Sequence, residues 1–395
     1  MAEQRFIPLS IPNFAGNEQK YVDEAVQAGW VSTGGAFIRR MEQDLAKFLH
    51  VENVACCQSG TSALHLSLVD AGVRPGDVVL VPPLTFIAAV NPVKYQFATP
   101  VFIDCDDSFC MDPVKLRRFC EEECELQGDQ LVDKETHGVV KAVVVVHVFG
   151  NLADMESILR IAEQYHLTVI EDATEALGSH YTEGPLAGKY AGTIGDYGAY
   201  SFNGNKIITT GGGGAITARS PETVDHLRYL STQAKDDPHY YIHHEIGYNY
   251  RMTNLQAALG VAQMEELPGF IQRKKENYEL YTELFDGYEN GKLLPFRPGT
   301  EPNRWFYSLE INRERVKNTM REIITELENR GVGTRAIWGL INEQRPYEGE
   351  RTYHLEKAPY YAARILNIPS STQLEGDDIR QAAKVIKEVL DEMAK

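Results

Sequence analysis

The sequence lacks several features that would assign it to common classes of protein. Its first residues, MAEQRFIPLSIPNF, contain no basic region followed by an apolar run, so we expect no signal peptide. No stretch approaches the roughly 20 apolar residues of a membrane-spanning helix. The formal net charge is −17, which repels nucleic acid and anionic membrane surfaces. We therefore expect a cytoplasmic protein with small-molecule substrates and neither nucleic acid nor membrane as a partner.

Metal-binding and disulfide patterns are also missing. The six cysteines include an adjacent pair and an i,i+4 pair but no CxxC, so we interpret them as reduced thiols. His239 and His243 are four residues apart, but no HExxH pattern completes a site, and we expect no bound metal. A Walker phosphate loop is excluded as well, because the glycines at 211–214 follow Lys206 instead of preceding a GK[ST] sequence.

The first two thirds of the chain alternate between apolar runs and amphipathic segments. Helical spacing occurs at 17–29, 37–51 and 153–166, and a strand, a glycine turn and a helix are predicted from residue 53. Further strands are predicted from the apolar runs at 77–82, 99–104, 141–150, 167–172 and 197–202. This alternation indicates an α/β fold with a buried, mostly parallel sheet covered on both faces. Ligands of such sheets bind beyond the carboxyl ends of the strands.

The pattern changes after about residue 255. A long helix is predicted through NLQAALGVAQMEEL and past Pro268, followed by a strand at 304–311 and helices at 316–331 and 377–394. We expect a large domain over residues 1–255, including an N-terminal helical arm, and a smaller α+β domain over residues 256–395.

One pair of residues indicates a cofactor. Asp172 ends an apolar strand in EDATEALGS, and Lys206 lies beside the glycines of SFNGNKIITTGGGGAI. Pyridoxal phosphate requires a lysine for its Schiff base and an acid that keeps its pyridine nitrogen protonated. Taken singly, Asp172 could instead cap a helix and Lys206 could be a solvated surface lysine. Their combination favours the cofactor.

Two further segments suit the same ligand. Gly60, Thr61 and Ser62 open a helix directly after a strand, where free amides and the positive helix end favour a phosphate. A plain strand-to-helix turn is the alternative. Phe86 follows another strand, where its ring could lie against a flat cofactor or pack in the core.

The combination of motifs resembles one family. SGTSALHLSL, PPLTFIAAVNP, HVFGNLADM, EDATEALGS, SFNGNKIITTGGGGAI and GYNYRMTNLQAALG occur in this order in the DegT/DnrJ/EryC1/StrS sugar aminotransferases. The resemblance extends from about residue 7 to residue 394. It implies the aspartate-aminotransferase fold (fold type I of pyridoxal phosphate enzymes), with a mostly parallel seven-stranded sheet flanked by helices and a smaller C-terminal α+β domain.

The resemblance also implies roles for individual residues. Lys206 would form the Schiff base, Asp172 would contact the pyridinium, and Phe86 would stack on the ring. Glu175 stands where the family often has glutamine or histidine, near the cofactor hydroxyl. The implied phosphate ligands are Gly60, Thr61, Ser62 and Ser201, together with Asn249 from the neighbouring subunit of a homodimer.

The implied reaction moves an amino group from glutamate to a nucleotide-linked keto sugar. The version of the lysine motif is similar to that of enzymes that aminate carbon 4 of UDP-4-keto-6-deoxy-N-acetylglucosamine. Candidate substrate contacts, each of which could instead be structural, are Arg251, Arg304, Trp305, Arg335 and Trp338. A keto-sugar dehydratase, an aromatizing synthase and a non-catalytic regulator that keeps the cofactor are the alternatives. Relatives that act as dehydratases have histidine in place of the lysine.

Overall fold

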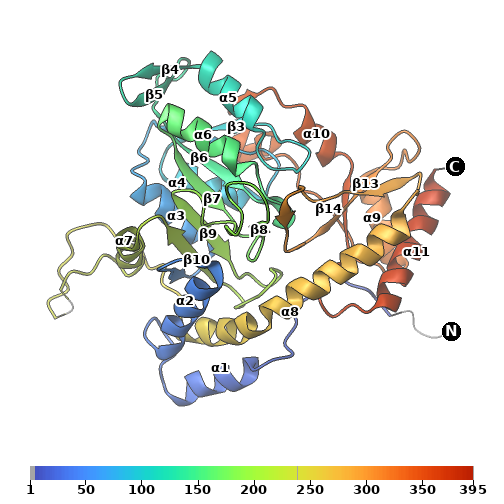
Figure 1. Ribbon diagram of the computed structural model, residues 1–395, viewed down its shortest axis with the longest axis horizontal. Coiled ribbons are helices and arrows are strands. Elements are labelled where there is room, and N and C mark those ends of the chain that lie inside the picture. Colours follow the sequence, from blue (N-terminus) through green and yellow to red (C-terminus); the bar gives the residue numbers. More distant parts are fainter. Residues whose placement is uncertain (1–4, 238, 395) are drawn as a thin grey trace.

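The main structural element is an eight-stranded sheet, seen in a computed structural model that describes residues 5–237 and 239–394 (Figure 1). Its strand order is β1-β10-β9-β7-β6-β2-β3-β15. The bounds are Ala55–Cys57 for β1, Val78–Val81 for β2, Thr99–Ile103 for β3, Val140–Val146 for β6, Thr168–Asp172 for β7, Tyr197–Ser201 for β9, Gly214–Ala218 for β10 and Thr352–Tyr353 for β15. Strands β9 through β15 pair in parallel, whereas β10 is antiparallel to both β1 and β9.

The mostly parallel sheet is therefore confirmed, with two strands that the sequence did not indicate. The two-residue strand β15 comes from the C-terminal part of the chain and makes the sheet eight-stranded where seven strands were expected. Strand β10 follows directly after the glycines, and its short GAITA segment carries no extended apolar run. The two residues of β15 are too few to form a pattern, and β10 is hidden by its composition, since it begins with glycine and has a single branched apolar residue.

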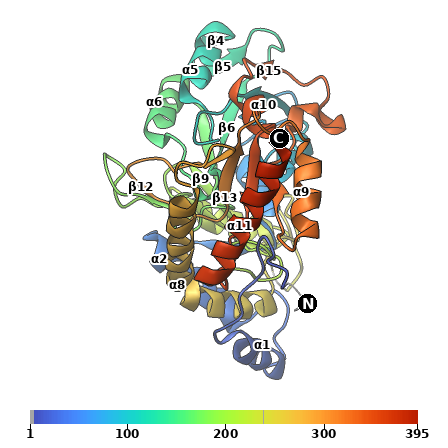
Figure 2. The ribbon, with the colours of Figure 1, turned by 90° about the vertical axis from the view of Figure 1, so that its right-hand side faces the viewer.

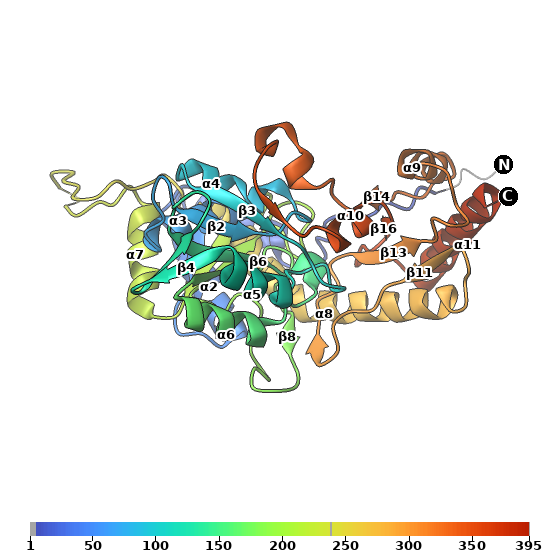
Figure 3. The same ribbon diagram turned by 90° about the horizontal axis from the view of Figure 1, so that it is seen from above.

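Helices cover the two faces of the sheet, as its buried strands require. In Figure 3, α3 and α4 lie on one side of the strands and α5 and α6 on the other. The helices of this part of the chain are α1 (Glu18–Gln27), α2 (Ala36–Leu49), α3 (Gly60–Asp70), α4 (Asn91–Tyr95), α5 (Pro113–Glu122), α6 (Met155–Tyr165) and α7 (Pro221–Ser231). After α5 the chain forms a hairpin of β4 (Cys124–Gln127) and β5 (Gln130–Asp133).

The long helix α8 (Asn254–Phe285) joins the sheet to the C-terminal part, as Figures 1 and 3 show. Thr253 and Gln256 form a capping box at its start, and the helix continues through Pro268, as predicted. Ala257 and Val261 belong to the large buried cluster around the main sheet, whereas Tyr281 and Phe285 belong to a second cluster. Burial at both ends offsets the hydrogen bond that Pro268 cannot donate.

The C-terminal part has its own sheet and helices. Strands β11 (Gly291–Leu293), β13 (Tyr307–Ile311), β16 (Ile365–Ile368) and β14 (Arg335–Ala336) pair antiparallel in that order, and β12 (Thr300–Glu301) pairs with β8 (His180–Tyr181). Helices α9 (Met320–Asn329) and α11 (Gly376–Met393) stand beside this sheet in Figure 2, and the short helix α10 covers Lys357–Ala362. A domain boundary between residues 255 and 256 stays a prediction, since α8 contributes to both buried clusters.

All six cysteines are free and buried, in agreement with their interpretation as thiols. Within the described residues, no helix combines the length and apolarity that a membrane crossing requires. Nor do those residues bring together three His, Cys, Asp or Glu side chains that could hold a metal ion.

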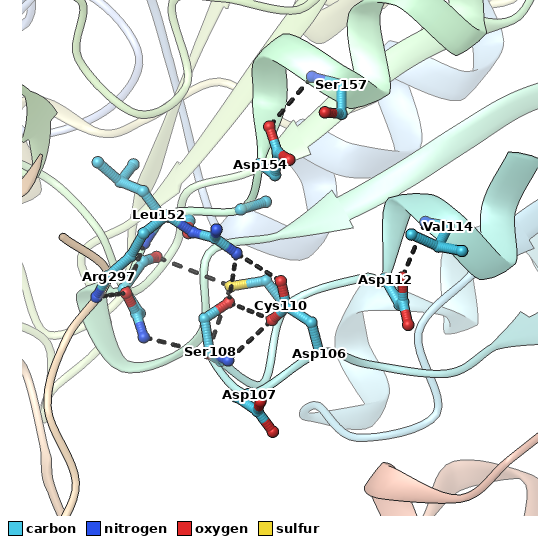
Figure 4. A network of polar contacts seen from close by, with 12 residues as sticks. Asp106, Asp107, Ser108, Cys110, Asp112, Val114, Leu152, Asp154, Ser157 and Arg297 are labelled. Atoms are coloured by element: carbon cyan, nitrogen blue, oxygen red, sulfur yellow. Dashed lines mark hydrogen bonds and ion pairs between the residues drawn. The ribbon is translucent and has the colours of Figure 1, made fainter. Parts of the chain in front are cut away.

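A polar network attaches the start of the C-terminal part to the main sheet (Figure 4). Arg297 donates to Asp106, to the Ser108 hydroxyl at 3.0 Å and to the Leu152 carbonyl at 2.7 Å. Asp106 and Ser108 lie in the loop after β3, and Leu152 lies in the loop after β6. The Arg297 side chain thus connects its own segment to two loops of the main sheet. Only 23% of the Arg297 side chain is exposed, which strengthens these charge-assisted hydrogen bonds.

Replacing Arg297 with leucine should lower the free energy of unfolding by about 2–3 kcal/mol, because it leaves the half-buried Asp106 carboxylate without its partner. Urea unfolding measures this loss. Arg160 offers a matched control, since its ion pair with Glu156 is exposed on α6. The R160L variant should lose less than about 0.5 kcal/mol. Equal losses in the two variants would contradict the structural role of the network.

Candidate active site

Two adjoining cavities meet at Lys206. The first has a volume of about 270 Å³ and lies at the carboxyl ends of β7 and β9. Its lining residues are Ser59, Gly60, Thr61, Leu64, Thr85, Phe86, Ala88, Ala89, Asp172, Thr174, Glu175, Ser201, Asn203, Lys206, Gly212 and Gly213. The second, of about 310 Å³, is lined by Phe86, Phe149, Glu175, Asn203, Asn205, Lys206, Trp305, Phe306, Arg335, Ala336, Trp338 and Asn367. Lys206 therefore faces both spaces.

Lys206 is held between an acid and an indole ring. Its Nζ lies 3.5 Å from Glu175 Oε1 and 4.1 Å from the centroid of the Trp305 ring. The Trp305 indole N–H donates to the Asn205 carbonyl at 2.7 Å, which places the ring beside the lysine turn. The Lys206 side chain is 12% exposed, so its ammonium group is largely removed from water but remains compensated by charge.

Two buried carboxyl groups that line the first cavity, those of Asp172 and Glu175, have raised pKa values. Burial raises the pKa of Asp172, against the opposing effects of hydrogen bonds to Thr174 and the charges on Lys206 and His147. Burial also raises the pKa of Glu175 to about 7, although the Lys206 charge and the Phe149 amide, which donates to Oε2 at 2.9 Å, favour the ionised form. Such shifts cluster at sites that transfer protons.

The beginning of α3 forms a wall of the first cavity. The Ser59 hydroxyl accepts from the Ser62 amide at 3.0 Å and caps the helix. The amides of Gly60 and Thr61, in the first turn, have no carbonyl partner within the helix and can bind an anion. A Cβ on Gly60 would lie 2.8 Å from Thr174 Cγ2 and 2.9 Å from Ser201 Cβ, so only glycine allows α3 to approach β9 this closely.

These features fit pyridoxal phosphate. Asp172 is buried and lines the first cavity, where its carboxyl group can pair with a protonated ring nitrogen. The anion site at α3 lies in the same cavity as the lysine. Phe86, with 56% of its surface exposed, lines both cavities and offers a ring face to a planar ligand.

Most of the predicted site residues line these cavities. Gly60, Thr61, Phe86, Asp172, Glu175, Ser201 and Lys206 line the first, and Trp305, Arg335 and Trp338 line the second. Ser62 does not line either cavity; it is buried, and its hydroxyl lies 2.8 Å from that of Ser59. Asn249 is exposed and pairs with Thr232, away from both cavities of its own chain.

Two predicted substrate arginines have other partners in the chain. Arg251 is held by Glu42 and donates to the Cys56 carbonyl at 3.0 Å, and its side chain is only 10% exposed. Arg304 donates to Glu301 at 2.6 Å and to the Pro302 carbonyl at 2.9 Å. Neither lines either of the two cavities that meet at Lys206, so a contact of Arg251 or Arg304 with the substrate stays a prediction. A residue can lie in or beside a family motif in the sequence while its long side chain points away from the site.

Asn303 joins two segments that carry lining residues, and the sequence analysis did not identify it. Its side chain is fully buried, donates to the carbonyls of Glu175 and Leu177 at 2.9 and 3.0 Å, and accepts from the Trp305 amide at 3.0 Å. The loop that carries Glu175 is thereby joined to the segment that carries Trp305. A buried asparagine between Pro302 and Arg304 gives no signal in the sequence that would distinguish it from a loop residue.

Comparison with solved structures identifies the class of protein. The chain superposes on the aminotransferase TlmJ from Streptoalloteichus hindustanus with a TM-score of 0.86 and 25% identity, covering 98% of this chain and 99% of the other. An aminotransferase from Brucella abortus gives a TM-score of 0.84 at 26% identity, with 94% and 95% covered. Fold and cavities together define an aminotransferase of the pyridoxal phosphate fold type I class.

The chain belongs to the DegT/DnrJ/EryC1/StrS aminotransferase family, which matches residues 12–388. It is 34% identical to the GDP-perosamine synthase of Caulobacter vibrioides (strain ATCC 19089 / CIP 103742 / CB 15), with 99% of this chain and all of the other covered. It is 31% identical to EpsN of Bacillus subtilis (strain 168), whose name describes a pyridoxal phosphate-dependent aminotransferase, with 96% and 95% covered. The chain is thus a pyridoxal phosphate-dependent aminotransferase, as the motifs implied.

The raised pKa of Glu175 predicts a pH-dependent stability in the cofactor-free protein. Between its usual value of 4.5 and about 7, Glu175 is protonated in the folded state and ionised in the unfolded state. Its contribution to stability therefore falls as pH rises through this window. From pH 5 to pH 7 the wild type should lose about 2 kcal/mol relative to E175Q, measured by urea unfolding. Parallel pH profiles for the two proteins would contradict the shift.

Proposed function

We propose that the protein transfers an amino group from glutamate to the keto carbon of a nucleotide-linked sugar, with Lys206 moving the proton. The observation that carries this proposal is the position of Lys206 between two cavities, one suited to the cofactor and one with aromatic walls. A lysine in this position can serve both the cofactor and a substrate in the second cavity.

Pyridoxal phosphate would supply an electron sink and a carrier for nitrogen when bound. Asp172 would hold a proton at its pyridine nitrogen, Phe86 would stack on its ring, and Glu175 would contact its hydroxyl face. The amides of Gly60 and Thr61, with the hydroxyl of Ser201, would bind its phosphate.

Lys206 has the surroundings of a proton carrier. Its Nζ lies 3.5 Å from Glu175 Oε1, and the pKa of that carboxyl, about 7, lets Glu175 take up or release a proton near neutral pH. The Trp305 ring covers another side of the ammonium group and excludes water. Such an environment favours proton exchange with a bound substrate over exchange with solvent.

The second cavity suits a nucleotide sugar. Trp338 stacks on Phe149 with centroids 4.7 Å apart, and Trp305 stacks on Phe306 at 4.0 Å, so two aromatic pairs form its walls. Aromatic faces suit sugars and bases. Arg335 lines the same cavity, is exposed, and has no carboxylate partner among the described residues. Its guanidinium can therefore pair with a diphosphate.

Two nucleotides are supported by different observations. The lysine motif is similar to that of enzymes acting on carbon 4 of UDP-4-keto-6-deoxy-N-acetylglucosamine. The relative at 34% identity and another from Escherichia coli O157:H7 at 33% are, by name, GDP-perosamine synthases. A GDP-linked keto sugar is thus the second candidate substrate, and amination at carbon 4 of a 4-keto sugar is the reaction proposed for either.

The test supplies the holoenzyme with glutamate and a panel of UDP-, GDP- and dTDP-linked 4-keto sugars, and measures the amino sugar by mass spectrometry. One of these sugars should gain nitrogen. The K206A variant should lose activity by on the order of 10³-fold, because the proton carrier is absent. Borohydride should attach the cofactor to the wild type but not to K206A. The control, K189A, removes an exposed lysine and should behave as the wild type.

Other outcomes would support the alternatives. Consumption of a keto sugar without nitrogen gain would indicate a dehydratase, and a bound cofactor with no turnover of any sugar or glutamate would indicate a regulator. A cofactor that borohydride still attaches to K206A would show that another lysine holds it.

The active site is proposed to be shared between the two subunits of a homodimer. A loop after α7 reaches out from the body of the subunit in Figures 1 and 3. It exposes Tyr240, Tyr241 and Ile246, with 81%, 68% and 85% of their surfaces accessible, and Asn249 lies at its base. Exposed apolar side chains of this size favour contact with another subunit, where Asn249 could reach the partner's cofactor phosphate.

A mixing experiment tests this sharing. K206A and N249A should each be strongly impaired as separate homodimers. After unfolding and refolding together, mixed dimers should contain one site with both native residues, and activity should recover to about a quarter of the wild-type value. If Asn249 serves its own subunit, each mixed dimer keeps only singly defective sites and activity stays at the level of the separate variants.

A further inference from the structure

A third cavity, of about 300 Å³, lies in the C-terminal part and shares no lining residue with the two active-site cavities. It is formed where β11 and β13 meet the segment around α10. The charged and aromatic side chains that face it include Lys292, Glu310, Arg313, Glu314, Tyr360 and Arg364. The proposed transfer of nitrogen uses none of them.

Arg313 is the unusual member of this set. It directly follows Asn312 at the end of β13, and its Nη1 atom is buried without a hydrogen-bond partner among the described residues. A guanidinium has five N–H donors and is always charged, so a buried unpaired donor is costly. Burial, and then the charge on Arg364, lower the pKa of Arg313. The chain thus places two like charges together without a carboxylate bound to Arg313.

Arg364 uses only part of its guanidinium group for contacts with the described residues. Its guanidinium lies over the Tyr360 ring, 3.9 Å from the centroid, and Nη1 donates to the Tyr360 carbonyl at 3.2 Å. This stacking holds the group flat against the cavity wall. The other N–H groups of Arg364 have no acceptor among the described residues, and Lys292 adds a third positive charge to the lining.

The acids of the cavity do not neutralise these arginines. Glu310 accepts a hydrogen bond of 2.5 Å from the Tyr360 hydroxyl, and Glu289, which also lines the cavity, pairs with Arg315 at 2.9 Å. Glu314 is exposed and forms no ion pair with Arg313 among the described residues. Glu289 is therefore paired with an arginine outside the cavity lining. Neither Glu310 nor Glu314 forms an ion pair with Arg313 or Arg364 among the described residues, so both guanidinium groups remain available.

We propose that this cavity binds a small oxyanion of the phosphate class, held by Arg313 and Arg364. Guanidinium groups match the oxygens of phosphate with paired N–H donors, and two of them converge on one space here. A bound dianion would offset the repulsion between the two arginines. The site would be separate from the cofactor phosphate site and would not depend on the reaction assigned to the enzyme.

The first test is a calorimetric titration of the holoenzyme with inorganic phosphate at constant ionic strength. Using the holoenzyme keeps the cofactor phosphate site filled. The R313Q variant should bind phosphate roughly tenfold more weakly or worse, because one charge-assisted interaction is lost. R364Q should also weaken binding. The matched control is R321Q, which removes an exposed arginine from α9 and should leave the affinity unchanged.

The second test locates the anion. Crystals of the holoenzyme soaked in tungstate should show anomalous density beside Arg313, and crystals of R313Q should not. Thermal unfolding of each variant establishes that it is folded. Unchanged phosphate affinity in both R313Q and R364Q, or tungstate density elsewhere but absent from this cavity, would overturn the proposal.

Discussion

The active site depends on keeping one ammonium group and two carboxyl groups together while most water is excluded. Burial alone would neutralise Asp172 and Glu175, and the charge on Lys206, together with amide donors, opposes that tendency. Parallel strands provide the geometry, because β7 and β9 end at the same edge of the sheet and place Asp172 near the turn that carries Lys206. Close packing of α3 against β9 at Gly60 completes the enclosure.

The second cavity requires the C-terminal part to be held firmly against this edge. Helix α8 has buried side chains in both hydrophobic clusters, Arg297 attaches to the loops after β3 and β6, and Asn303 attaches to the loop after β7. Trp305 follows Asn303 directly and covers Lys206. The aromatic wall of the second cavity therefore depends on buried hydrogen bonds to backbone groups, which have a fixed geometry.

The cavity around Arg313 differs from the active site in how its charged groups are paired. In the active site, each buried charge has a partner supplied by the chain, whereas Arg313 has a buried donor with no acceptor among the described residues. Two guanidinium groups that line one cavity without a carboxylate partner among the described residues favour an external anion as their ligand. The C-terminal part would then contribute both a wall of the active site and a separate anion site.

The sequence alone determined the succession of the main strands and helices along the chain and the cofactor, because apolar periodicity and local motifs depend on neighbouring residues. Tertiary structure decided what sequence proximity could not: β10 and β15 became strands by pairing with distant segments, Arg251 turned toward Glu42, and Asn303 became a buried connector. Long side chains and loop amides take their partners from whatever packs beside them. Those partners are set by contacts between residues far apart in the chain.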